Sequence, residues 1–158
     1  MPHTAASTFA AVFATLWVAH FFGDHWVQTS AQSMAKGKKG WTGRLADTRH
    51  VLTLTLTKGL LLALAAAVLD LRLSIAGLLL GLGLDAGSHW WADRRTTLAW
   101  LAKVTRQTEF YRLGSDTLHT TTEDDGITGK HLGTGAYALD QSFHVLFLFF
   151  AALIIAAL

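Results

Sequence analysis

The chain has 158 residues, of which 51% are hydrophobic and only 15% are charged. A soluble domain usually has about 25% charged residues, so this composition argues against a soluble protein and indicates an integral membrane protein. The chain has no cysteine, which excludes disulfides and thiolate metal sites. Its net charge is only +2, and the basic residues lie between apolar runs, which argues against a nucleic-acid-binding patch.

Four apolar runs follow one another, each about the 20 residues needed to cross the hydrocarbon core of a bilayer. The predicted spans are residues 8–27, 50–69, 73–92 and 135–158. The first run lacks a basic flank and a small-residue cleavage signature, so it is not interpreted as a cleaved signal peptide. The sequence therefore predicts one all-α domain over residues 1–158, an integral membrane bundle of four transmembrane helices in up-down-up-down order.

The basic residues between the spans predict the orientation. Five of the Lys and Arg residues lie in residues 29–49 and six lie in residues 93–134, whereas none precedes the first span. Cytoplasmic loops carry an excess of Lys and Arg. Both loops are therefore expected in the cytoplasm and both termini outside.

The loop of residues 93–134 contains one further helical pattern. Within Arg95–Leu113, the residues Leu98, Leu101, Val104 and Trp100 are expected on one face of a short helix lying on the membrane surface. Residues 115–135 are rich in Thr, Gly and Asp and are expected to be flexible. Solvated side chains are expected there at His119, His131 and Glu123–Asp125.

Histidine and aspartate residues are spaced four apart at four places, which puts each pair on one helix face. The pairs are His20/Asp24, Asp85/His89, His89/Asp93 and Asp140/His144. Ionisable groups within membrane spans are costly and usually face the bundle interior. In an up-down bundle these pairs, together with His50 at the start of the second span, meet at one depth near the cytoplasmic leaflet.

These side chains form a predicted metal site. The candidate ligands are His20, Asp24, His50, His89, Asp93, Asp140 and His144. Imidazoles and carboxylates suit a divalent ion, with Zn²⁺ preferred and Mn²⁺ or Fe²⁺ as alternatives. Seven candidates exceed one tetrahedral shell, so either two ions bind or some Asp residues orient the His rings. The competing interpretation is that they are polar anchors at headgroup depth.

Several other polar residues adjoin the predicted site. Lys58 lies about 12 Å deeper than His50 by helix rise and is expected to pair with Asp85. His25 is expected to point away from the ligands, about 100° from Asp24. Candidates for contacts with a substrate or with the ligands are Gln28, Gln141, Arg94 and Arg95.

The segments AHFFGDHWVQ, HWWADRR and DQSFH, with a lone His opening the second span, resemble a known family. It is domain of unknown function 3307, a bacterial family of small integral membrane proteins with the pattern H-x-x-G-D-x-x-x-Q, H-x-x-x-D-x-x-K/R and D-Q-x-x-H. The pattern maps to His20, Gly23 (one residue late), Asp24 and Gln28, then His89, Asp93 and Arg94 or Arg95, then Asp140, Gln141 and His144. The resemblance covers the four spans but not the long loop.

That family is similar in style to membrane-bound metal-dependent hydrolases of the bacterial inner membrane. The resemblance therefore implies a metallohydrolase in that membrane, without naming a reaction. In such an enzyme Asp24 or Asp93 is expected to act as general base, on a lipid or amphipathic phosphoester.

Two other functions remain compatible with the sequence. One is a metal carrier or sensor in which Lys58 and Asp85 form part of a path, although the apolar far half argues against such a path. The other is a structural protein whose His/Asp cluster only holds the helices together. The expected partner is membrane lipid and not nucleic acid, and a homo-oligomer is compatible with the sequence.

Overall fold

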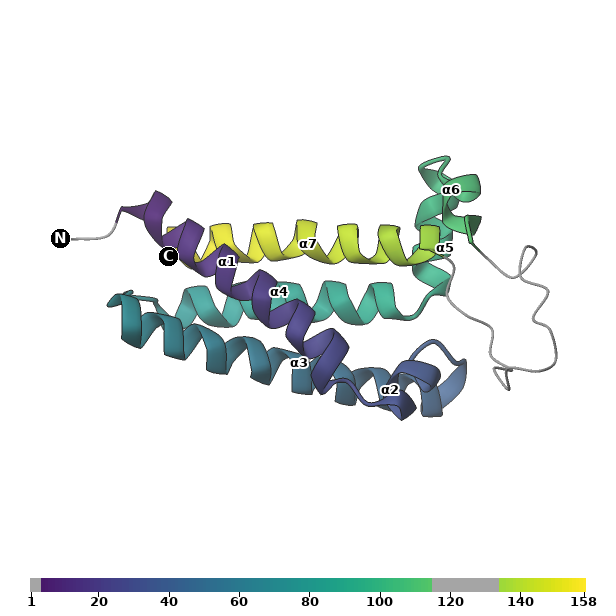
Figure 1. Cartoon of the computed structure of the whole chain (residues 1–158), viewed down its shortest axis with the longest axis horizontal. Coiled ribbons are helices and arrows are strands. Elements are labelled where there is room, and N and C mark those ends of the chain that lie inside the picture. The colour runs from purple at the N-terminus through teal and green to yellow at the C-terminus, as the bar shows by residue number, and fades with distance from the viewer. Residues whose placement is uncertain (1–3, 115–133) are drawn as a thin grey trace.

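The computed structural model describes residues 4–114 and 134–158, and within these ranges the chain is helical, with short connecting segments and no strand. The helices are α1 (Ala5–Phe22), η1 (Gly23–Val27), α2 (Ser30–Ala35), α3 (Gly40–Leu69), α4 (Ile75–Asp93), α5 (Thr96–Val104), α6 (Thr108–Arg112) and α7 (Thr134–Ala157). Helices α1, α3, α4 and α7 run along the long axis in alternating directions (Figure 1). The start of α1, the end of α7 and the α3–α4 turn lie at one end, and α2, α5 and α6 at the other. The predicted all-α fold is confirmed.

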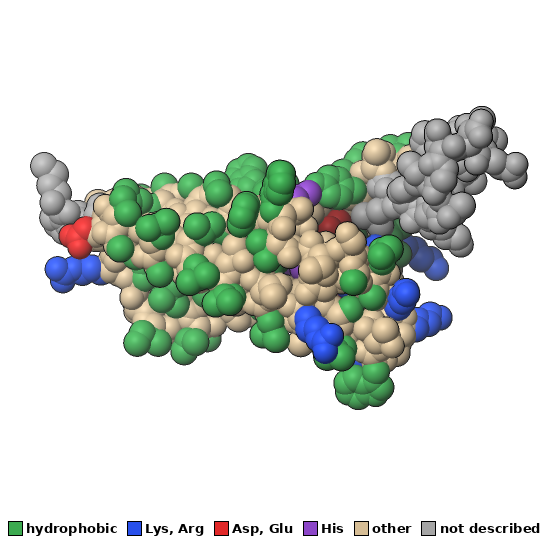
Figure 2. Space-filling view, turned by 60° about the horizontal axis from the view of Figure 1, so that its bottom comes forward, with side chains coloured by type: hydrophobic (Ala, Val, Ile, Leu, Met, Phe, Trp, Pro, Cys, Tyr) green, Lys and Arg blue, Asp and Glu red, His purple; other side chains and the backbone are tan. Residues whose placement is uncertain are grey.

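The outer surface of the bundle is apolar along most of its length. Three of the described helical segments are long and apolar enough to cross a membrane, namely Ala5–Val27, Gly40–Leu69 and Thr134–Ala157. Along α3, the residues Leu52, Leu56, Leu60 and Leu64 repeat every four positions and are 59–64% exposed. Figure 2 shows hydrophobic side chains spread over the body, with most Lys and Arg side chains at one end. A continuous exposed apolar surface of this kind indicates a membrane protein.

Helix α4 is not among the three described segments that are long and apolar enough to cross a membrane. Its second half carries Asp85, His89 and Asp93, and all three side chains are buried in the bundle. Its first half contacts α7 closely because Gly77 and Gly81 face that helix. A Cβ at Gly81 would lie 2.8 Å from the carbonyl oxygen of Ala151, so only glycine permits this separation.

One helix boundary differs from the prediction. The second span was expected to begin at residue 50, but α3 begins at Gly40, so that boundary is wrong by ten residues. The apolar run marks the part of a helix suited to lipid, whereas the helix itself continues through a polar segment. As a result Asp47, expected in a loop, is a fully buried helical residue one turn before His50. The other three spans agree with the described helices to within three residues.

The predicted helix over Arg95–Leu113 is two short helices, α5 and α6. The chain breaks between them, where Arg106 has a φ of 60°. Leu98, Trp100 and Val104 were expected on one face toward the membrane, but Leu98 is buried in the protein whereas Trp100 and Val104 are 57% and 60% exposed. The second buried residue of α5 is Ala102, which lies one turn after Leu98. Residues 115–133, with the expected flexible segment and its His and acidic residues, lie outside the described ranges.

Candidate metal centre

Helix α1 passes into a π-turn where the site begins. The Gln28 amide donates to the Gly23 carbonyl oxygen over five residues, at 2.9 Å. Single π-turns are frequent at functional sites because the inserted residue redirects nearby side chains. A Cβ at Gly23 would overlap the side chain of Leu54, so glycine lets η1 lie directly on α3. This contact brings Asp24 of η1 against His50 of α3.

Four side chains from η1, α3 and α4 converge on one point. The Nε2 atom of His50 lies 3.0 Å from Asp24 Oδ1, 3.1 Å from His89 Nε2 and 3.4 Å from Asp93 Oδ2. The Nε2 atom of His89 lies 3.2 Å from Asp93 Oδ2 and 3.8 Å from Asp24 Oδ1. Ligands bound at 2.0–2.2 Å in a tetrahedron are roughly 3.3–3.6 Å apart. Five separations among these four atoms, which we call the donor set, are thus 3.0–3.8 Å, close to the spacing of a tetrahedral site.

The donor set is buried and incompletely hydrogen-bonded. Asp24 Oδ1 and Asp93 Oδ2 are buried and make no hydrogen bond of regular geometry with a described residue, although His50 Nε2 lies 3.0 Å from the first and Lys36 Nζ 2.9 Å from the second. Buried polar atoms nearly always have a partner, so each exception needs an explanation. Two carboxylate oxygens that face two imidazole nitrogens fit a divalent cation, because its charge would be neutralised and all four atoms coordinated.

His144 and Asp140 lie on the α7 side of the donor set. His89, Asp93 and His144 make a second group whose ligand atoms lie within 4.8 Å of one another. His144 Nε2 is 3.5 Å from Asp140 Oδ1 and 3.9 Å from Asp93 Oδ1, and its ring stacks on that of His89. The second group shares His89 and Asp93 with the donor set. Since one ring nitrogen binds one ion, the two groups compete for His89.

His20 lies beside the donor set but belongs to neither group. Its Nε2 donates to Gln141 Oε1 at 3.3 Å. The Gln141 amide nitrogen in turn donates to Asp24 Oδ2 at 3.2 Å and to Asp140 Oδ2 at 3.3 Å. The amide orientation follows from this network, because its oxygen would repel the two carboxylates. His20 and Gln141 thus orient Asp24, whereas His20 was predicted as a ligand.

Lys36, at the end of α2, is a site residue that the sequence analysis missed. Its Nζ lies 2.9 Å from Asp93 Oδ2 and 3.9 Å from Asp24 Oδ1. Burial alone would lower the pKa of Lys36, but the charges of Asp93 and Asp24 outweigh it and raise the pKa above its ordinary value. The side chain is therefore an ammonium that touches the donor set. Nothing local in the sequence distinguishes it from Lys38 and Lys39.

The two candidate arginines have different surroundings. Arg94 donates to the carbonyl oxygens of Lys36 and Lys38 and lies 4.0 Å from the buried Asp47 carboxylate. It therefore fastens the segment before α3 to the end of α4. Arg95 instead lines a pocket beside the donor set.

A deeper ion pair lies below the donor set. Lys58 Nζ donates to Asp85 Oδ2 at 2.6 Å, and both side chains are buried. The predicted contact between these two residues is confirmed. Asp85 lies one helical turn before His89, so the pair separates the donor set from the apolar far half.

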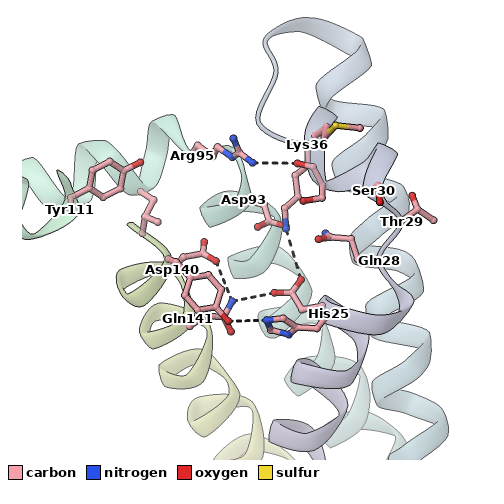
Figure 3. Close-up of a pocket in the computed structure, with 15 residues that line it drawn as sticks. His25, Gln28, Thr29, Ser30, Lys36, Asp93, Arg95, Tyr111, Asp140 and Gln141 are labelled. Carbon is pink, nitrogen blue, oxygen red and sulfur yellow. Dashed lines mark hydrogen bonds and ion pairs between the residues drawn. The ribbon is translucent and has the colours of Figure 1, made fainter. Parts of the chain in front are cut away.

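A pocket of about 470 Å³ opens next to the donor set (Figure 3). Carboxylates of Asp24, Asp93 and Asp140 line it together with polar and cationic side chains, which are His25, Gln28, Thr29, Ser30, Ser33, Lys36, Arg95, Tyr111, Tyr137 and Gln141. His25 donates from Nδ1 to the Phe21 carbonyl oxygen, so its Nε2 accepts from the Tyr137 hydroxyl at 2.8 Å. His25 stays out of the donor set, as expected, but it does line this pocket.

Comparison with known proteins gives one match. Residues 12–158 match a family described as proteins of unknown function (DUF3307). No curated protein and no solved structure matches the chain. The matched range includes nearly all of the four long helices and every residue of the donor set.

Proposed function

Because this chain belongs to domain of unknown function 3307, we propose its function from the site alone: a membrane-embedded, metal-dependent hydrolase of a lipid or other amphipathic phosphoester. The observation that carries the proposal is a donor set with tetrahedral spacing that borders an open pocket. Structural zinc sites are closed by protein ligands, whereas catalytic sites keep a position for water or substrate. Asp24 and Asp93 belong to both the donor set and the pocket wall. Because the four protein ligands fill a tetrahedral shell, a water from the pocket would bind the ion as a fifth ligand on this side.

We assign the ion to Asp24, His50, His89 and Asp93, one ion per chain. Two imidazoles and two carboxylates at this spacing favour Zn²⁺ over Mn²⁺ or Fe²⁺, which prefer more ligands. When bound, such an ion lowers the pKa of water toward about 7 and polarises a phosphoryl oxygen.

The proton acceptor is best assigned to Asp140. Asp24 and Asp93 were the candidates from sequence, but both lie in the donor set and would be occupied as ligands. Asp140 lines the pocket, its side chain is 15% exposed, and the Gln141 amide holds it in place. As general base, Asp140 takes the proton of the attacking water, and the neighbouring His144 at 3.5 Å stabilises its charge.

The far half of the molecule argues against a metal carrier, because its interior is apolar. There Val12, Leu16, Leu62 and Leu148 form an apolar cluster with residues of the end of α7. An ion path needs polar groups through the membrane. Between the donor set and this cluster the described residues provide the Lys58–Asp85 pair, whose two charges neutralise each other.

The proposed topology has four spans, with α4 as the fourth because its charged side chains face the bundle interior. We place both termini outside and the site end in the cytoplasm, in the bacterial inner membrane, since most of the Lys and Arg residues lie at that end. The chain has no cysteine, so single cysteines at Ser7 and Lys38 can be labelled without background. They should react from opposite sides. Labelling of Ser7 from the cytoplasm would overturn this topology.

The enzymatic proposal is tested with the purified full chain in detergent. Elemental analysis should find one divalent ion per chain, and the ion-loaded protein should hydrolyse a member of a phospholipid and phosphoester panel. Asp140→Asn should keep the ion and lose the turnover. The proposal is wrong if no ion copurifies or can be loaded, or if Asp140→Asn retains full turnover.

A further inference from the structure

The charged groups that line the pocket set the charge of the anion it can accept. Three carboxylates (Asp24, Asp93 and Asp140) and two cations (Lys36 and Arg95) give −1, and one divalent ion changes this to +1. Buried charges are weakly screened, so this balance acts directly on a bound group. A phosphodiester carries one negative charge at neutral pH, whereas a phosphomonoester carries about two. A singly charged diester therefore neutralises the loaded pocket, and a monoester leaves an excess negative charge.

Arg95 lines the pocket and has an unfavourable backbone conformation. Its φ is 57°, a conformation that costs a non-glycine residue about 1–3 kcal/mol and persists where the surroundings require it. Its side chain crosses the backbone of Gly37, where a Cβ would lie 2.7 Å from Arg95 Cδ. The Ser33 carbonyl oxygen accepts one of its N–H bonds at 3.3 Å. A guanidinium has five such donors in a planar fork that matches two oxygens of a phosphate.

Tyr111 of α6 adds a neutral donor to the same pocket. Burial raises the pKa of Tyr111, so the side chain keeps its hydroxyl proton. Lys36 is already engaged with Asp93 at 2.9 Å, which leaves Arg95 as the cation for an anion in the open part of the pocket, beside Tyr111 and other neutral donors such as Gln28. One cation among neutral donors again suits a single negative charge.

The pocket also borders the apolar outer surface. Its edge is formed by His25 of η1 and Tyr137 of α7, whose side chains are joined by the hydrogen bond of 2.8 Å. Next to them on η1 and α1, Trp26 and Phe22 are 81% and 50% exposed. An apolar group attached to the phosphate would leave the pocket here along a surface suited to lipid.

Resting on the proposed function, we propose that the pocket is selective for a singly charged phosphodiester and that Arg95 and Tyr111 are its specificity-determining contacts. The diester comes either from a membrane lipid that leaves its apolar part at the η1–α7 edge or from a water-soluble ester.

The test is a titration of the ion-loaded full chain in detergent micelles at pH 8, read by calorimetry. Dimethyl phosphate and methyl phosphate are matched probes that differ mainly in charge, and phosphatidylglycerol and phosphatidic acid are the corresponding lipids. Each diester should bind about tenfold more tightly than its monoester, as expected for the loss of one unfavourable charge. Phosphatidylglycerol binding more tightly than dimethyl phosphate identifies a lipid source, and equal binding identifies a soluble one.

Variants assign the effect to residues. Arg95→Ala and Gly37→Ala, which displaces the Arg95 side chain, should each weaken diester binding about tenfold. Both should keep the ion, as checked by elemental analysis. Tyr111→Phe should weaken binding less, and Arg49→Ala, at an exposed arginine outside this pocket, should change nothing.

Equal or tighter binding of the monoesters overturns the selectivity, and unchanged diester binding in Arg95→Ala overturns the role of Arg95. In both cases a loaded ion and intact turnover would leave the proposed function standing. If the chain takes up no ion, the proposed function itself is wrong.

Discussion

The two halves of the bundle differ in what they bury. The half near the chain ends buries an apolar cluster that includes Leu16, Leu62, Leu148 and Ile155. The other half buries histidines, aspartates and a lysine, several of whose polar atoms have no hydrogen bond from the described residues. The first half can hold the helices together by packing alone. The second half is costly to bury, and such groups persist in membrane proteins mainly where they serve a function.

The largest effect is expected at the boundary between these halves, where Lys58 and Asp85 form a buried pair. Lys58→Leu leaves the Asp85 charge buried and alone, which should lower the free energy of unfolding by about 3–5 kcal/mol. Thermal and chemical unfolding in detergent measure this. The double variant Lys58→Leu/Asp85→Leu should recover most of the loss, because no charge is then left unpaired. A double variant as unstable as the single one would show that the pair itself stabilises the fold.

The next largest effect is expected in the donor set. His89→Ala removes a nitrogen that lies within 3.8 Å of the other three ligand atoms, so the affinity for Zn²⁺ should fall at least about 100-fold, or about 2.7 kcal/mol. Competition with a chelating indicator gives the dissociation constant. His25→Ala is the matched control, since His25 contacts Phe21 and Tyr137 instead of the donor set. Equal losses in both variants would contradict the assignment.

The part of the site on regular helices was predictable from the sequence. Residues four apart share a face of any helix, so the pairs Asp85/His89 and Asp140/His144 could be placed inward from spacing alone. Alternating helix direction then brought them to one end. The same reasoning explains why the Lys58–Asp85 contact could be foreseen, because both residues lie in the regular interior of long helices.

The rest depends on irregular or long-range structure. Lys36 reaches the donor set because α2 starts with a capping box at Thr29 and Gln32 and then turns its end toward α4. No periodicity predicts that contact. The π-turn at Gly23 likewise changes the register after His20, so spacing could not show that His20 contacts Gln141 while Asp24 enters the donor set. Asp47 was missed because the apolar run understated the length of α3.

A smaller effect is expected in the apolar half of the bundle, at Gly81 of α4. Gly81→Ala places a methyl group against Ala151 and Ile155, which should lower the free energy of unfolding by about 1–3 kcal/mol. Gly83→Ala is the control on the same helix, since a Cβ there meets nothing within 4 Å. That variant should be neutral or more stable by up to about 1 kcal/mol, because alanine favours the helix. Unfolding temperatures in detergent compare the two, and equal values would argue against close α4–α7 packing.

The smallest expected effect lies in the polar half, at Gln141. Its amide orients the Asp24 carboxylate and is itself held by His20, so Gln141→Met should leave the ligands present but less well oriented. Residues that orient ligands typically contribute about tenfold or more to metal affinity, and a tenfold loss is about 1.4 kcal/mol. Ser142→Ala is the control, because its exposed hydroxyl contacts only the Leu139 carbonyl oxygen among the described residues. If Gln141→Met binds Zn²⁺ as tightly as the unchanged chain, the donor set is held by packing of its own side chains. If affinity falls while the unfolding temperature of the ion-free protein is unchanged, the hydrogen-bond network acts on the site and not on the fold.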